Sequence, residues 1–191
     1  EYDIIITEIG GTVGDIESLP YVESVRQMLW EHENDCIVIH LTLVPFLAAT
    51  GELKTKPTQH SVKSLLEQGV QPDILVCRAE HELGLELRNK IARFCNVSAN
   101  AVIESLDVPT IYDVPIKMRE QNLDSVVLSK LGLSTQGEPN MEEWESFLKD
   151  LKSPEDEVNI GLVGKYVELH DSYKSIVESF IHSGATNKTK V

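Results

Sequence analysis

Short apolar runs rich in β-branched residues alternate with amphipathic stretches along this chain, and this alternation limits the folds that it can adopt. The strand-like runs occupy residues 3–7, 36–44, 73–77, 101–104 and 158–163. Helix patterns follow over residues 21–33, 61–68, 85–94, 141–151 and 171–181. Strands that alternate with helices predict an α/β fold, in which helices cover both faces of a parallel sheet.

A polar segment at residues 134–157 interrupts the alternation and predicts a connector, because it contains Gly137, Pro139, Pro154 and many acids. We therefore expect one domain at residues 1–133 and the start of a second at residues 158–191. The second domain would hold a single βα unit, too small to form its own core. The chain begins without Met, two residues before a strand pattern, so we expect a truncated domain with exposed apolar surface.

Charge and apolar patterning exclude several classes of function. The 17 basic and 31 acidic residues give a formal net charge of −14, which argues against binding to nucleic acid or to an anionic membrane. No apolar run approaches the roughly 20 residues of a membrane span. Cys36, Cys77 and Cys95 lie in apolar runs without metal-like spacing, so we expect reduced, buried thiols and a cytoplasmic protein.

The segment from Glu8 to Ser18 is the first candidate for a ligand site. It contains three glycines within five residues and lies between a predicted strand and a predicted helix. In a parallel sheet the carboxyl end of a strand is where ligands bind. Glu8 is placed to hold Mg²⁺ beside a nucleotide phosphate, and Asp15 and Glu17 offer further acceptors. A glycine-rich turn with solvated acids is the alternative interpretation.

The segment from Thr50 to Ser61 is the second candidate. Two lysines, Lys54 and Lys56, precede a predicted helix start. Helix N-termini attract anions, and lysine adds positive charge for a phosphate. The pattern therefore favours a triphosphate site, and the alternative is a solvated basic loop capped by Thr58. Lys90 and Asp107 are unremarkable when taken alone, and the six histidines have no metal-ligand spacing.

These segments together resemble the CTP (cytidine triphosphate) synthase family. The resemblance is carried by EIGGTVGDIESLP, HLTLVPFLAATGELKTKPTQHSV, QPDILVCR, KIARFCNV, TIYDVP and GLVGKYVELHDSYKS, in that order. It covers nearly the whole chain. It implies a P-loop-type sheet like that of dethiobiotin synthetase, followed by the first βα unit of a class I glutamine amidotransferase domain.

The resemblance also implies an activity. The family aminates UTP to CTP in a reaction that consumes ATP, requires Mg²⁺ and uses ammonia released from glutamine. GTP is its allosteric activator, and its active unit is a homotetramer. Pyrimidine nucleotide biosynthesis is therefore the expected role of the enzyme to which this chain belongs.

Residue roles carry over from the family by position. Glu8 is similar to the Mg²⁺ ligand. The positions that contact UTP or the inhibitor CTP are Asp15, Ile16, Glu17, Lys54, Thr55, Lys56, Pro57, Thr58, Gln59 and Lys90. The positions that contact the ATP adenine are Leu106, Asp107 and Val108.

Two family features are absent from the sequence. It has no G-x-x-x-x-G-K-[ST] phosphate loop, and none of its cysteines lies in the context of a glutaminase nucleophile. We therefore expect this chain alone to be inactive. Two alternatives remain: another P-loop-type ligase related to dethiobiotin synthetase, and a non-enzymatic fragment that binds CTP or UTP or joins an assembly.

Overall fold

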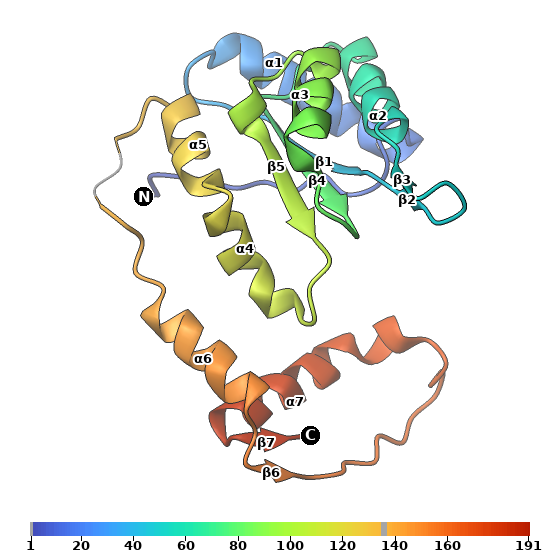
Figure 1. Cartoon of the computed structure of the whole chain (residues 1–191), viewed down its shortest axis with the longest axis vertical. Coiled ribbons are helices and arrows are strands. Elements are labelled where there is room, and N and C mark those ends of the chain that lie inside the picture. The colour runs from blue at the N-terminus through green and yellow to red at the C-terminus, as the bar shows by residue number, and fades with distance from the viewer. Residues whose placement is uncertain (1, 135–136) are drawn as a thin grey trace. The chain divides into compact units, whose positions relative to one another are not determined.

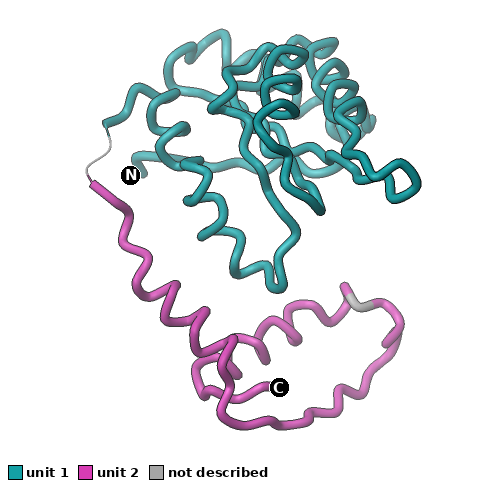
Figure 2. Tube along the Cα trace, viewed as in Figure 1, with its two compact units in different colours: residues 1–136 teal, residues 137–191 magenta. Residues whose placement is uncertain are grey.

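The computed structural model describes residues 2–134 and 137–191. The chain divides into two compact units, residues 1–136 and residues 137–191 (Figure 2). Each unit is described separately below. The connector predicted over residues 134–157 includes residues 135–136, which lie outside the described part of the chain.

The first unit is built on a three-stranded parallel sheet (Figure 1). Its strands are β1 (Ile39–Leu43), β4 (Ile74–Ala79) and β5 (Val102–Leu106), in the spatial order β1-β4-β5. The register places His40 of β1 opposite Leu75 of β4. The predicted α/β class with a parallel sheet is therefore confirmed, and three of the predicted strands form it.

Helices cover both faces of this sheet (Figure 1). On one face α2 (Lys56–Glu67) and α3 (Gly84–Cys95) pack against alternate strand residues such as Leu75 and Cys77. On the other face α4 (Val114–Glu120) and α5 (Leu123–Lys130) pack against the intervening residues. Alternate strand residues thus enter two separate cores, as the period of two in a strand requires.

Local chemistry sets the helix boundaries. The helix α1 (Leu19–Glu31) begins with Pro20 in its first turn, and α2 begins at Lys56 with Pro57 in its first turn. Proline is favoured there because its missing N–H would have no partner in any case. The structure therefore starts α2 earlier than the predicted residue 61. The 3₁₀ turns are η1 (Ile16–Ser18), η2 (Ala99–Ala101), η3 (Ile111–Asp113) and η4 (His170–Tyr173).

The strand predicted at residues 3–7 is wrong. The residues are not in a strand, and Ile5 and Ile6 are 79% and 93% exposed. A β-strand needs a neighbour for its backbone hydrogen bonds, and no described residue pairs with this segment. Glu8 therefore does not follow a strand. The exposed apolar surface expected from the sequence is confirmed here.

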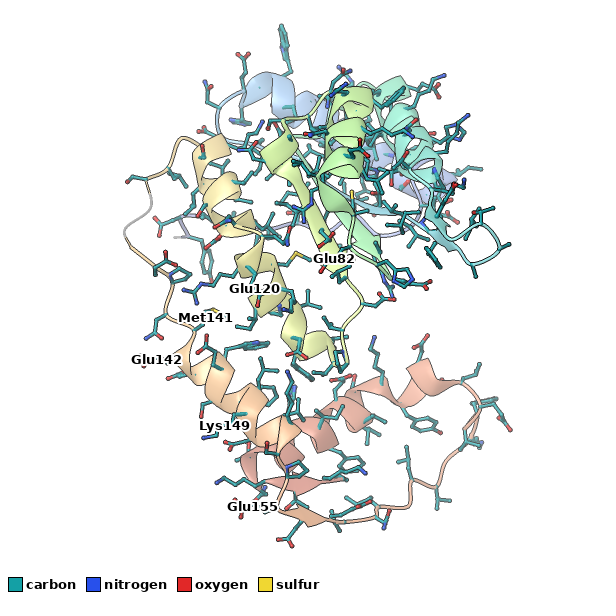
Figure 3. The ribbon with its side chains drawn as sticks, viewed as in Figure 1. Glu82, Glu120, Met141, Glu142, Lys149 and Glu155 are labelled. Carbon is teal, nitrogen blue, oxygen red and sulfur yellow. The ribbon has the colours of Figure 1, made fainter. Side chains whose placement is uncertain are left out.

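The second unit is a small parallel β-α-β arrangement with one additional helix. Its strands β6 (Asp156–Glu157) and β7 (Thr189–Lys190) pair in parallel, and α7 (Lys174–Thr186) connects them. Helix α6 (Glu142–Lys152) packs against α7. Glu142 lies near the start of α6 and Lys149 near its end (Figure 3), which suits the helix dipole.

The strand predicted at residues 158–163 is also wrong. Pairing between β6 and β7 ends where the Val158 N–H donates to the Lys190 carbonyl at 2.8 Å. The residues that follow are exposed, and Val163 is 98% exposed. A continued strand would need a longer partner than β7. Among the described residues, no helix has the length and hydropathy needed to cross a membrane.

Candidate functional site

The carboxyl ends of β1, β4 and β5 lie at one edge of the sheet, because all three strands run in the same direction. The hydrogen-bond ladder continues past the strands there. The Val44 N–H donates to the Arg78 carbonyl at 2.8 Å, and the Asp107 N–H donates to the Ala79 carbonyl at 3.1 Å. In open α/β sheets this edge is where ligands bind. It holds the segments that lead into α2 and that follow β5.

The N-terminus of α2 is available to an anion. Its N-cap residue, Thr55, makes no side-chain hydrogen bond to the backbone of the first turn. The Thr55 carbonyl accepts the first intrahelical bond, from the Gln59 N–H at 3.1 Å. The backbone N–H groups of Lys56 and Thr58 precede that bond and are among the orphan donors of the helix. Lys56 and Pro57 are exposed at this end.

Two threonines of this segment use their hydroxyls in hydrogen bonds within the protein. Thr58 is fully buried, with its Oγ1 3.0 Å from the Leu43 carbonyl oxygen and 3.2 Å from Thr42 Oγ1. Thr55 is also buried, and its Oγ1 accepts a bond from Gln59 Nε2 at 3.0 Å. These side chains attach α2 to β1 and shape its first turn. Because Thr58 is 0% and Thr55 4% exposed, these two residues support the first turn from inside, and the exposed groups at this helix end belong to Lys56 and Pro57.

Lys54 lies just outside the helix, on an antiparallel hairpin formed by β2 (Phe46–Leu47) and β3 (Glu52–Leu53). Its Nζ is 2.5 Å from Glu52 Oε2. The hydrogen bond from Lys54 is the main cause that lowers the pKa of Glu52, and the charge of Lys90 on α3 contributes as well. Lys54 therefore already has a carboxylate partner on the hairpin that carries it.

One contact closes the base of the hairpin, and another attaches it to the rest of the unit. The Lys54 N–H donates to the Pro45 carbonyl at 2.9 Å. The Phe46 ring meets the His81 ring edge-on, with the centroids 4.2 Å apart. His81 lies in the loop after β4, a segment for which the sequence suggested no role. That loop therefore supports the hairpin that carries Lys54.

The predicted adenine contacts follow β5. Leu106 and Val108 are partly buried, and Asp107 is exposed between them. Arg78 Nε lies 2.9 Å from Asp107 Oδ1, so this carboxylate already has a cationic partner at the end of β4. Leu106 and Val108 offer backbone groups and apolar surface at the edge of the sheet where Lys54 also lies.

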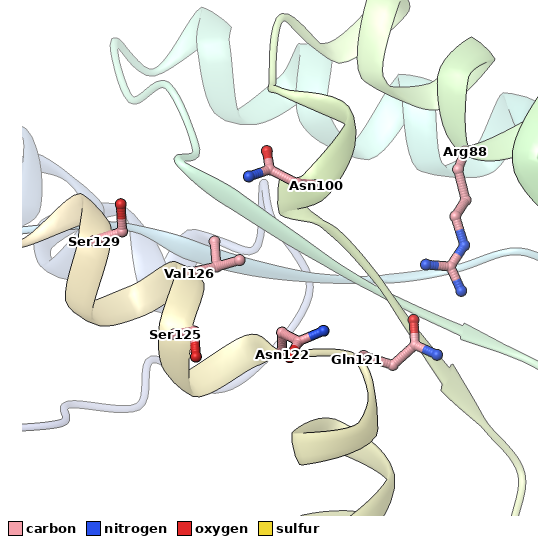
Figure 4. A pocket seen from close by; sticks show the side chains of 7 residues that line it. All are labelled: Arg88, Asn100, Gln121, Asn122, Ser125, Val126 and Ser129. Carbon is pink, nitrogen blue, oxygen red and sulfur yellow. The ribbon is translucent and has the colours of Figure 1, made fainter. Parts of the chain in front are cut away.

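A separate cavity of about 460 Å³ opens beside α3, η2 and α5 (Figure 4). None of the predicted site residues lines it. Arg88, which reaches its edge, pairs at 3.4 Å with Glu104, a buried carboxylate that also accepts the Leu83 N–H at 2.5 Å. Arg88 and Leu83 thus satisfy a buried acid. The lining residues are Arg88, Asn100, Gln121, Asn122, Ser125, Val126 and Ser129.

The glycine-rich N-terminal loop is exposed. Asp15 closes a turn, since its Oδ2 accepts the Thr12 N–H at 2.8 Å, and Gly11 adopts a φ of 87° that favours glycine. Among the described residues, no hydrogen bond or ion pair joins this loop to α2 or β3. Its Val13 packs against a core cluster that includes Leu65 of α2.

A metal site built wholly from protein is not found in residues 2–134 and 137–191. No group of three or more His, Cys, Asp or Glu side chains in that part of the chain could hold a metal ion. Mg²⁺ commonly uses one or two carboxylates together with nucleotide phosphates. Glu8 is exposed and has no ion-pair partner among the described residues.

Comparison with known proteins gives consistent matches. The family model described as "CTP synthase N-terminus" matches residues 1–133. The whole chain is 67% identical to the CTP synthase of Flavobacterium johnsoniae, 65% identical to that of Cytophaga hutchinsonii and 55% identical to that of Porphyromonas gingivalis. It spans 36%, 36% and 35% of the length of these relatives, respectively.

Proposed function

The chain belongs to the CTP synthase family, and on that premise we propose that the enzyme containing it aminates UTP to CTP. ATP would phosphorylate the uracil 4-oxygen, and ammonia released from glutamine would displace that phosphate. The observation that supports this most directly is the placement of Lys54 beside the uncapped N-terminus of α2. An ammonium and free backbone N–H groups at the carboxyl edge of a parallel sheet suit a triphosphate.

The proposed role of each residue in binding the triphosphate depends on whether the residue is exposed. Lys54, Lys56 and the N–H groups of the first turn of α2 would hold the triphosphate of UTP or of the inhibitor CTP. Lys90 would add a further positive charge from α3. Thr55 and Thr58 would shape this site from inside, because both residues are buried and their hydroxyls are bonded within the protein. Pro57 and Gln59 would complete the wall of this site.

The other predicted contacts come from separate segments. The pyrimidine nucleotide would contact Asp15, Ile16 and Glu17. The ATP adenine would contact Leu106, Asp107 and Val108. Glu8 would hold Mg²⁺, whose charge would offset that of the nucleotide phosphates. Positioning and charge neutralisation of this kind supply most of the catalysis in phosphoryl transfer.

The second unit belongs to the same proposal. Residues 158–191 would begin the glutamine amidotransferase domain, and residues 134–157 would connect it to the synthetase domain at residues 1–133. The assembled enzyme would be a cytoplasmic homotetramer activated by GTP.

The test uses Lys54→Ala and Glu8→Ala in the intact enzyme, with steady-state kinetics at varied UTP and Mg²⁺. Loss of a charged hydrogen bond predicts that Lys54→Ala raises the KM for UTP about tenfold to a hundredfold. Glu8→Ala should lower Mg²⁺-dependent turnover more than it weakens UTP binding. Lys63→Ala, which removes an exposed lysine from the same helix α2, is the matched control and should leave both unchanged.

Two results would contradict the assignment. A Lys54→Ala enzyme with the KM of the control variant would remove Lys54 from the site. Binding of diaminopelargonate in place of UTP would indicate the other ligase that the sequence allowed, a relative of dethiobiotin synthetase.

A further inference from the structure

Lys54 of the proposed triphosphate site is already paired with a carboxylate. Lys54 Nζ contacts Glu52 Oε2 at 2.5 Å, and no other carboxylate among the described residues pairs with Lys54. A ligand phosphate that bonded to Lys54 would therefore have to displace this carboxylate.

The hairpin geometry puts Glu52 in that place. In an extended segment, residues two apart project to the same side, and Glu52 and Lys54 are two apart at the end of β3. The bond from the Lys54 N–H to the Pro45 carbonyl fixes the backbone of the lysine. The side chain of Glu52 is 60% exposed, so it can swing into solvent without disturbing the core.

The ion pair is also weak enough to exchange. Exposed pairs of this kind contribute little because water and salt screen them. A triphosphate carries several negative charges and can accept from both a lysine and the backbone N–H groups of α2. It competes for Lys54 more strongly than a single carboxylate does, whereas a ligand with one negative charge has no such advantage.

We propose that Glu52 is a displaceable counter-ion, which occupies Lys54 in the empty site and must leave when an anionic nucleotide binds. It lowers the affinity for the triphosphate and favours ligands with high negative charge. This inference rests on the proposed function for its natural ligand. Its electrostatic part can be tested with inorganic triphosphate alone.

The experiment is a titration of UTP and of inorganic triphosphate into the intact enzyme and its Glu52→Gln variant, at low and high salt. The variant should bind both ligands about two- to fivefold more tightly at low salt, and the difference should shrink at high salt. The matched control is Glu23→Gln, which removes an acid from another exposed pair, Glu23 with Arg26 at 2.8 Å on α1. The control should bind like the wild type.

A double variant shows whether Glu52 acts through Lys54. In a Lys54→Gln background, the further change Glu52→Gln should have little effect, because the pair is already broken. An undiminished effect in that background would overturn the counter-ion role at Lys54.

Weaker or unchanged binding by Glu52→Gln, relative to Glu23→Gln, would also overturn the proposal, since it would mean that Glu52 positions Lys54 or is irrelevant to it. Failure of the wild type to bind UTP would refute the proposed function instead. The comparison with inorganic triphosphate would then still decide the role of Glu52.

Discussion

Replacing Thr58 by valine would separate the structural part of the candidate site from the part that meets a ligand. The side chain is fully buried, and its hydroxyl bonds to the Leu43 carbonyl at 3.0 Å and to Thr42 at 3.2 Å. Valine has nearly the same shape, so the change removes these bonds and leaves the packing volume almost intact. The bonds join the first turn of α2 to the end of β1.

The expected cost follows from the loss of one partner of a buried hydrogen bond. A buried acceptor left without its donor costs about 1–3 kcal/mol, and the added methyl group offsets part of that. We expect Thr58→Val to lower the free energy of unfolding by about 1–2 kcal/mol. For a chain of this size each kcal/mol corresponds to a fall in Tm of about 2–4 °C.

Urea denaturation followed by circular dichroism measures this change as a shift in midpoint at constant slope. The matched control is Thr50→Val, an exposed threonine whose hydroxyl lies 3.5 Å from the Leu47 carbonyl oxygen. It should change stability by less than about 0.5 kcal/mol. Equal midpoints for the two variants would refute the structural role. A large loss of UTP affinity in a stably folded Thr58→Val enzyme would show that the hydroxyl binds ligand.

Two further predictions concern buried ionisable groups. Burial lowers the pKa of His40 from 6.5, so the folded state binds fewer protons than the unfolded state, and stability should fall as pH drops below about 6.5. His40→Gln should flatten this fall in Tm between pH 7.5 and 5, whereas His60→Gln, at an exposed position, should not. Burial raises the pKa of Cys77 and raises that of Cys95 to about 11. Native protein should therefore react with iodoacetamide at the half-buried Cys36, and mass spectrometry showing fast labelling of Cys77 would contradict this.

Local patterns predicted the elements that pack against a partner within the chain. The runs that became β4 and β5 bury alternate residues in two cores, and the amphipathic stretch that became α3 buries one face in the first of them. Where no partner was present, the same kind of pattern failed. Residues 3–7 have the composition of a strand, yet Ile6 is 93% exposed, because strand formation depends on a neighbouring backbone.

The candidate site shows the same division. The basic segment around Lys54 could be found from sequence, because lysines before a helix start suit a phosphate in any α/β fold. Glu52 was missed, although its spacing from Lys54 was visible, because its significance depends on the hairpin that makes them neighbours. The burial of the Thr58 hydroxyl could not be predicted from the sequence either, because threonine is also common at helix starts as a capping residue.

The sequence by itself determined the α/β class, the family resemblance and the segments that can carry charge to a nucleotide. These depend on residue type and on spacing along the chain. Only the tertiary structure decided that Lys54 pairs with Glu52, that Arg88 satisfies the buried Glu104, and that the Thr58 hydroxyl lies in the core. Such pairings depend on which elements pack together, and the free energy of that packing is a property of the whole fold.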